Sequence, residues 1–279
     1  MTFSIAARVG DAYGVAVASK FIAVGSVVPA VRLGVGAIAT QAMAKVSYGA
    51  DGLELLAAGS SAPETVARLT AADEGRDNRQ LGVVGASDQS TFSGPACMDW
   101  AGGVSGGDAD SGYAIQGNIL MGEQVVLNME QAWLDHPQLP LTYRLMQTLV
   151  AGDNAGGDRR GRQSAALFAV APGSGYDHNG VLADLRVDDH PAATQELIRL
   201  LDLHDLYFGS PGKVLPLEGP LEQEVRAHLR SLGRSQPDLD AALREWAGEA
   251  NLEMRLTRDG IDSRMLEQLR KADRSPNPT

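Results

Sequence analysis

Cysteine, positive charge and long apolar runs are scarce in this chain, and each scarcity excludes a class of structure or function. Cys97 is the only cysteine, so an internal disulfide is excluded and a reducing compartment is expected. The 24 basic residues are outnumbered by 35 acidic ones, and the net charge of −11 argues against partners such as nucleic acid or a membrane surface. No apolar run approaches the roughly 18–20 residues of a membrane-spanning helix. Without a basic segment ahead of an apolar stretch we expect no signal peptide and a cytoplasmic location.

Motifs for common cofactors and metals are also missing. The five histidines are scattered without the spacing of metal ligands, and neither a P-loop nor a Rossmann fingerprint is present. We therefore predict no cofactor and no metal site. Cys97 stands outside any motif that would make it a nucleophile, and such a cysteine is more often a small buried apolar residue.

What the sequence does contain is a predicted strand that begins at its second residue. Residues 2–7 and 14–20 are apolar, β-prone runs separated by a polar turn, which predicts a hairpin. A small second residue permits removal of Met1, which would leave Thr2 with a hydroxyl beside a free α-amine. That amine, with a pKa of about 7.7–8.0, can act as a base for the hydroxyl. Many proteins that are not enzymes also start with Met-Thr and a strand.

The order of predicted elements indicates the fold class. The order is strands, two helices, strands, two helices, strands, helix. This order suits an α+β fold in which two antiparallel sheets pack together with helices outside. A doubly wound sheet would alternate strands and helices singly. Beyond the first hairpin, we predict strands at 27–33, 35–40, 81–85, 90–93, 112–118, 163–170 and 180–187, and helices at 51–58, 62–72, 123–134, 141–151 and 191–204.

A linker divides the chain into two predicted domains. Gly209-Ser210-Pro211-Gly212 has the composition of a linker, and charged residues become denser from Asp205 onward. We predict a first domain at residues 1–206 and a small, mostly helical second domain at residues 213–275. The tail from Ser275 to Thr279 is predicted to be disordered.

Several short motifs together resemble a known family. The match covers roughly residues 2–206 and resembles a bacterial branch of the N-terminal-nucleophile (Ntn) hydrolases, the domain of unknown function 1028. It implies a four-layer αββα sandwich. The motifs are Thr2-Phe3-Ser4-Ile5, Gly14-Val15-Ala16-Val17-Ala18-Ser19, Arg79-Gln80-Leu81-Gly82, Gln116-Gly117-Asn118, and the runs at 156–166 and 184–191.

The resemblance implies catalytic roles for four residues. Thr2 matches the nucleophile, and the backbone N–H of Gln41 matches the donor that stabilises the oxyanion. Asp158 matches an Asp that supports the terminal amine. Lys20 stands where proteasome-like subunits carry an Asp, and near Pro29 the chain lacks their Lys. Lys20 or Arg32 would replace that missing cation and lower the pKa of the amine, or Lys20 is an ordinary surface charge.

Six further residues are candidates for substrate binding. Ser4 shares a strand face with Thr2, and Ser19 would bond within the site or merely end a strand. Gln116 and Asn118 would orient a substrate through their amides or form a turn. The basic run at 158–163 adds Arg160 and Arg162. These two would hold a substrate carboxylate, or they would stabilise their loop through ion pairs with acidic residues at 184–189.

The C-terminal part, from about 213 to 275, resembles a peptidoglycan-binding module. Trp246 would stack on a sugar, although a tryptophan at helical spacing is more often part of a core. We expect a core built from Leu229, Leu232, Leu243, Trp246, Leu252, Leu266 and Leu269.

The combined reading is an amidohydrolase that uses Thr2 to cleave a small amide or short peptide. The alternative is a non-catalytic ligand-binding or scaffold protein on the same fold, with a cell-wall-associated role as one form of it. The departure at Lys20 favours the alternative, and Thr2 favours the enzyme. Glycine-rich edges suggest a homo-oligomer.

Overall fold

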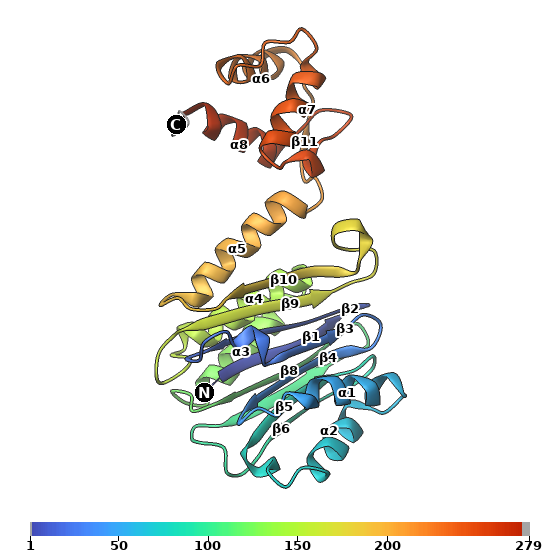
Figure 1. Cartoon of the computed structure of the whole chain (residues 1–279), viewed down its shortest axis with the longest axis vertical. Coiled ribbons are helices and arrows are strands. Elements are labelled where there is room, and N and C mark those ends of the chain that lie inside the picture. The colour runs from blue at the N-terminus through green and yellow to red at the C-terminus, as the bar shows by residue number, and fades with distance from the viewer. Residues whose placement is uncertain (1, 275–279) are drawn as a thin grey trace. The chain divides into compact units, whose positions relative to one another are not determined.

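The computed structural model describes residues 2–274, which form two compact units that divide after Leu201 (Figure 1). The first unit contains a six-stranded and a four-stranded sheet, and every strand pairing in it is antiparallel. The predicted combination of helices with antiparallel sheets is therefore confirmed.

The six-stranded sheet places the N-terminal strand at its centre. Its order is β10-β9-β2-β1-β8-β7, so β1 (Thr2–Val9) lies between β2 (Ala12–Ser19) and β8 (Ser111–Asn118). Seven of the eight residues of β1 are buried, because both of its edges are paired and both of its faces are covered. The other strands are β7 (Gly102–Gly107), β9 (Ser164–Val170) and β10 (Val181–Val187).

The four-stranded sheet packs against one face of the six-stranded sheet. Its order is β3-β4-β5-β6, with bounds Pro29–Arg32, Gly36–Ala42, Arg79–Val84 and Gln89–Ser93. The side chains between the sheets are mostly small, which brings the two backbones close together. Val15, Val17, Ala37, Ala39 and Val84 belong to this shared core.

Helices cover the remaining face of each sheet. Helices α1 (Ser47–Ala57) and α2 (Ala62–Ala71) pack on the four-stranded sheet, where Tyr48 and Leu69 meet Ile38 and Leu81. Helices α3 (Gln124–Asp135) and α4 (Leu141–Asn154) pack on the six-stranded sheet, where a second cluster contains Phe3, Ile5, Trp133 and Leu145. Figure 1 shows α1 and α2 on the side of β5 and β6.

The structure confirms the predicted start of one helix, α2, and corrects the predicted start of another, α1. Helix α2 is capped by Ser61, whose hydroxyl accepts the N–H of Glu64 while the Glu64 carboxylate accepts the N–H of Ser61. The helix predicted at 51–58, with Asp51 at its start as a cap, begins earlier in the structure, because α1 starts at Ser47 and Asp51 is exposed within it. Burial of Tyr48 extends this helix toward the N-terminus, and such packing is not visible in local sequence.

Strand β7 was not predicted from the sequence. Its residues, Gly-Gly-Val-Ser-Gly-Gly, have low β propensity, so the local pattern is that of a loop. Glycine is required where the strand crosses Tyr113, because a Cβ on Gly106 would lie 2.5 Å from the Tyr113 hydroxyl oxygen. The strand exists because β8 offers it a partner edge.

Helix α5 (Ala193–Phe208) crosses the division between the units. Leu197 and Leu201 pack in the core of the first unit, whereas Leu206 packs in the core of the second. The predicted first domain, 1–206, therefore ends five residues after the division at Leu201, and the predicted second domain starts at 213. The last residue of that domain and the tail at 275–279 lie outside the described residues.

The second unit is mostly helical. Trp246 and the predicted leucines lie in its core, and Trp246 is 5% exposed, which agrees with a structural role. The elements are β11 (Val214–Leu215), α6 (Gly219–Ser231), α7 (Leu239–Glu249), β12 (Ile261–Asp262) and α8 (Ser263–Arg274). Within residues 2–274, no helix combines the length and the apolar character needed to cross a membrane.

Candidate functional site

Thr2 lies where three strands of the central sheet end together. It opens β1, it pairs with Asn118 at the end of β8, and Ser19 is the last residue of β2. Thr2 is 6% exposed, and its Oγ1 lies 3.1 Å from the Oγ of Ser19. At this distance one hydroxyl donates a hydrogen bond to the other, so Ser19 is a direct hydrogen-bond partner of the candidate nucleophile.

A buried polar network lies beneath Thr2, between the two sheets. The Ser4 hydroxyl donates to Gln41 Oε1 at 2.6 Å, and it accepts from Gln116 Nε2 at 2.6 Å. Gln41 Nε2 and Asn118 Nδ2 both donate to Gln80 Oε1, at 2.6 and 3.1 Å. All five side chains are at most 2% exposed, so each amide depends on the others for its hydrogen bonds.

The network also holds the backbone of Thr2. Gln41 Nε2 donates to the Thr2 carbonyl oxygen at 3.2 Å, and Asn118 Nδ2 donates to the same atom at 3.4 Å. Gln41 itself pairs with Gln80 in the β4–β5 ladder. Two amides thus fix the position of Thr2 without using its hydroxyl.

Gln80 is the member of this network that we did not predict. It belongs to the motif Arg79-Gln80-Leu81-Gly82, and the alternation of a strand puts Gln80 and Gly82 on one face. Gly82 is needed for the close approach of Gln116, because a Cβ there would lie 2.2 Å from Gln116 Oε1. The signal that the sequence offered for Gln80 was a glutamine two residues before a glycine in a predicted buried strand.

Asp158 fixes the loop that follows α4 against the end of β2. It is 6% exposed, its Oδ2 accepts the backbone N–H of Lys20 at 2.7 Å, and its Oδ1 accepts the backbone N–H of Arg160 at 2.8 Å. The Arg160 guanidinium also lies 3.4 Å from Oδ2. Asp158 therefore fixes the backbone of Lys20, the residue that directly follows Ser19.

The Lys20 and Arg162 side chains form their hydrogen bonds with groups other than the Thr2 hydroxyl. The exposed Lys20 ammonium donates to the Arg162 carbonyl at 3.3 Å. Arg162 Nε donates to both carboxylate oxygens of Asp153, at 2.7 and 2.9 Å. Arg162 therefore pairs with Asp153 and not with residues 184–189, Arg160 has an ion pair with Asp158, and Asp184 pairs with Arg186.

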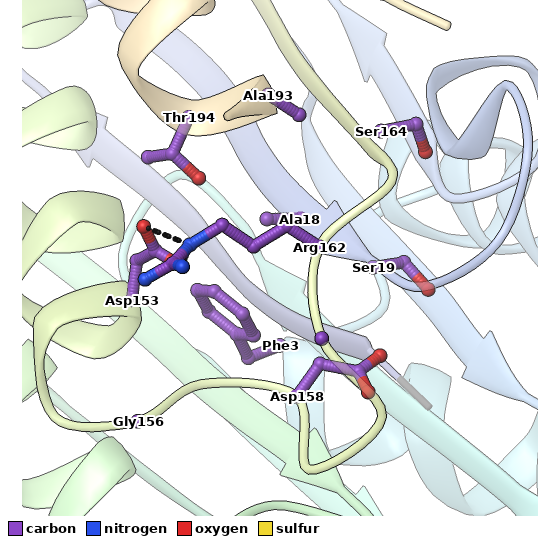
Figure 2. A pocket seen from close by; sticks show the side chains of 11 residues that line it. Phe3, Ala18, Ser19, Asp153, Gly156, Asp158, Arg162, Ser164, Ala193 and Thr194 are labelled. Carbon is purple, nitrogen blue, oxygen red and sulfur yellow. Dashed lines mark hydrogen bonds and ion pairs between the residues drawn. The ribbon is translucent and has the colours of Figure 1, made fainter. Parts of the chain in front are cut away.

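A small cavity lies between this loop and the start of α5 (Figure 2). Its volume is about 60 Å³, and Ser19, Asp153, Asp158 and Arg162 contribute to its polar lining. Figure 2 shows Arg162 reaching to Asp153 next to Phe3, with Asp158 on the side of Ser19. A cavity of this size holds a few water molecules and excludes an amide substrate.

A larger groove lies on the other side of Asn118. Its volume is about 530 Å³, and we call it the methionine groove; its lining includes Ala42, Met43, Arg79, Met98, Asn118 and Arg160. Ala42 and Ile119 both line it with positive φ angles, +69° and +50°, which are uncommon for residues other than glycine. Strained backbone of this kind is typical of functional sites.

A buried carboxylate anchors the wall of the groove. Asp73 accepts hydrogen bonds from Arg79 Nε at 3.0 Å and from the Tyr48 hydroxyl at 2.8 Å, which hold the pKa of Asp73 well below its usual range. Burial, followed by this hydrogen bond, raises the pKa of Tyr48. Cys97 also lines the groove, and burial raises the pKa of its thiol, which therefore stays protonated.

Comparison with known proteins places the chain in a family. Residues 2–197 match the family described as "Family of unknown function (DUF1028)". The chain belongs to the DUF1028 family. Protein SPO2555 from Silicibacter pomeroyi, a DUF1028 protein of known crystal structure, is 27% identical with a TM-score of 0.64, over 81% of this chain and 93% of that chain. The resemblance inferred from the motifs is confirmed.

The second unit matches a different family. Residues 207–269 match the domain described as "Putative peptidoglycan binding domain", which agrees with the resemblance seen in the sequence. No curated protein sequence is similar enough to count as a match. In the DUF1028 domain itself, Thr2, Ser4, Ser19, Gln41, Gln116 and Asn118 come together in one place. Asp158, Arg160 and Arg162 flank this place on the loop before β9, and Lys20 flanks it at the end of β2.

Proposed function

We propose that the DUF1028 domain is an Ntn amidohydrolase with Thr2 as its nucleophile. The observation that carries this proposal is the position of Thr2, the first residue of a buried central strand, with its hydroxyl 3.1 Å from Ser19 and its carbonyl held by two amides. Two packed sheets with helices on their outer faces support the assignment of an αββα sandwich.

The reaction needs Thr2 at the mature N-terminus. Its α-amine takes the proton from Oγ1 as this oxygen attacks the substrate carbonyl carbon. The backbone N–H of Gln41 is the proposed donor to the oxyanion of the tetrahedral intermediate. The amine then gives the proton to the leaving nitrogen as the C–N bond breaks. Water, deprotonated by the same amine, attacks the acyl ester and releases the acid and the Thr2 hydroxyl.

Neighbouring residues position this machinery. Ser19 orients the Thr2 hydroxyl, and the amides of Gln41 and Asn118 fix the Thr2 backbone. Asp158 holds the chain at Lys20, so the contribution of Lys20 is proposed to come through its backbone N–H rather than its exposed ammonium. Ser4 and Gln116 support Gln41 from below.

The test begins with the intact mass of full-length protein produced without an N-terminal tag. Loss of Met1 is the expected result, and a retained Met1 or an acetylated amine would refute the mechanism. Hydrolysis of a panel of N-acyl amino acid p-nitroanilides is then compared between variants. We expect Thr2→Ala to abolish turnover and Thr2→Ser to retain part of it, whereas Thr257→Ala, in the second unit, serves as a control without effect. Full activity in Thr2→Ala would also refute the proposal.

A non-catalytic binding protein is the second candidate. The match of residues 207–269 to a peptidoglycan-binding family favours it, and so does the Lys20 ammonium, which contacts Arg162 instead of the Thr2 hydroxyl. Co-sedimentation of the full chain with purified peptidoglycan tests this function. Sedimentation that is unchanged in Thr2→Ala, together with no turnover of any amide, would favour binding over catalysis.

A further inference from the structure

The methionine groove has an apolar rim that faces solvent. Met43 is 66% exposed and Met98 is 64% exposed, although methionine is ordinarily buried in a protein core. Methionine side chains are flexible and polarisable, so they adapt to apolar ligands of different shapes. The rim therefore suits an apolar group that would cover both side chains.

The groove also carries positive charge in an acidic protein. Arg79 lines the groove and forms an ion pair with Asp73 at 3.0 Å, and Lys45 contacts the same carboxylate at 3.6 Å. On the other wall, Arg160 keeps 46% of its side chain exposed while its guanidinium contacts Asp158. A chain with a net charge of −11 thus gathers cations at this groove, which favours an anionic ligand.

The groove is continuous with the surroundings of Thr2. Asn118 lines the groove, and its amide donates to the Thr2 carbonyl at 3.4 Å. Ala42, on the same lining, directly follows Gln41, whose amide donates to that carbonyl as well. A substrate lying in the groove would therefore have one end beside the candidate nucleophile.

The other two arginines of the basic run do not share this position. Arg162 is engaged by Asp153 and lines the small cavity, which is too small for a substrate. Arg159 is exposed and lines neither the methionine groove nor the small cavity. Of the three arginines, Arg160 alone lines the methionine groove. It is therefore the candidate for substrate specificity, and Arg159 and Arg162 are not.

We infer that the methionine groove binds substrates that combine an apolar side chain with a free carboxylate, such as short apolar peptides. Met43 and Met98 contact the apolar side chain, and Arg160 donates to the carboxylate. A guanidinium can bind both oxygens of a carboxylate while it keeps a further contact, since it has five N–H donors. The cleavage of such a substrate rests on the proposed function, but its binding does not.

Binding is tested in full-length Thr2→Ala protein, so that hydrolysis does not enter the measurement. The probes are N-acetyl-leucyl-leucine and its C-terminal carboxamide, which differ only in the charge that Arg160 would recognise, and calorimetry gives both affinities. We expect the acid to bind at least about tenfold more tightly, as a charge-assisted hydrogen bond implies. Arg160→Gln should remove this preference, and the matched control Arg159→Gln should keep it.

A second variant tests the groove without touching the Asp158 loop. Met43→Glu changes an exposed side chain and places a negative charge on the rim, so it should reduce binding of the acid more than binding of the carboxamide. Met98→Ser should weaken both probes by similar factors. Equal affinities for the two probes, or a preference that survives both Arg160→Gln and Met43→Glu, would overturn the inference.

The two proposals fail separately. If the acid preference is found but no amide is hydrolysed by the wild-type chain, the groove assignment stands and the hydrolase proposal falls. If the wild-type chain hydrolyses amides through Thr2 with no preference for an apolar acid, the hydrolase proposal stands and the groove assignment falls.

Discussion

Replacing Gln80 by leucine should remove the centre of the polar network while keeping most of the side-chain volume. Gln80 Oε1 accepts from Gln41 and Asn118, and the two N–H groups of its Nε2 are shared among three acceptors, Ser93 Oγ and the backbone carbonyls of Gly102 and Gly117. Two accepted bonds and two N–H donors, at about 1 kcal/mol net each, give a largest loss of about 4 kcal/mol.

Two effects reduce this figure. The amides of Gln41 and Asn118 keep the Thr2 carbonyl as an acceptor, so they are not left without a partner. The leucine also buries apolar area, which returns about 1–2 kcal/mol. We therefore expect Gln80→Leu to lower the free energy of unfolding of the first unit by about 3 kcal/mol.

Hydrogen exchange followed by mass spectrometry measures this loss unit by unit in the full chain. Peptides that cover β1 and β8 should lose protection, whereas peptides of the second unit should keep theirs. The control is Gln131→Leu, which changes an exposed glutamine on α3 and should stay within about 0.5 kcal/mol of the wild type. Equal protection of β1 in both variants would refute the argument that these buried amides depend on one another.

Three further predictions follow from single contacts. Gly82→Ala should destabilise the first unit by about 2 kcal/mol or more in urea unfolding, because the new Cβ meets Gln116 Oε1 at 2.2 Å; a stabilised variant would contradict this. Asp73 has a lowered pKa when folded, so its stabilisation is complete above about pH 4, the unfolded value, and is lost as the pH falls toward the folded value. Urea titrations at pH 5 and pH 3 should therefore show a smaller acid loss in Asp73→Asn than in the wild type. Asp262→Ala should cost the second unit about 3 kcal/mol in hydrogen exchange, since the buried Arg255 loses the nearer of its two carboxylate partners and the N–H groups of Arg264 and Met265 lose their acceptor; a normal second unit would disprove it.

The sequence predicted most elements because their patterns are local. The apolar runs around residues 2–7 and 14–20 became the hairpin of β1 and β2, and Ser61 with Glu64 marked the start of α2. The errors occur where tertiary contacts decide. Burial of Tyr48 lengthens α1, and the edge of β8 makes a strand of the glycine-rich segment 102–107.

The candidate site was predictable as a set of residues but not as a geometry. Ser4, Gln41, Gln116 and Asn118 were named from motifs, and the structure joins them through Gln80, whose position depends on the packing of two sheets. The methionine groove left no periodic signal, because Met43 and Met98 come from segments 55 residues apart in sequence. Arg160 and Arg162 looked equivalent in the sequence, and the structure distinguishes them, because Arg160 lines the methionine groove whereas Arg162 lines the small cavity and pairs with Asp153.

The central place of β1 has a consequence for synthesis on the ribosome. β1 pairs first with β2, but its other edge pairs with β8, which ends about 110 residues after Val9. At 5–20 residues per second, the nascent hairpin waits roughly 5 to 20 s with an apolar edge unpaired. During that time Thr2 is available to processing enzymes that the folded sheet would exclude. The proposed removal of Met1 would therefore compete with completion of the fold, and a chaperone that shields the hairpin would influence both.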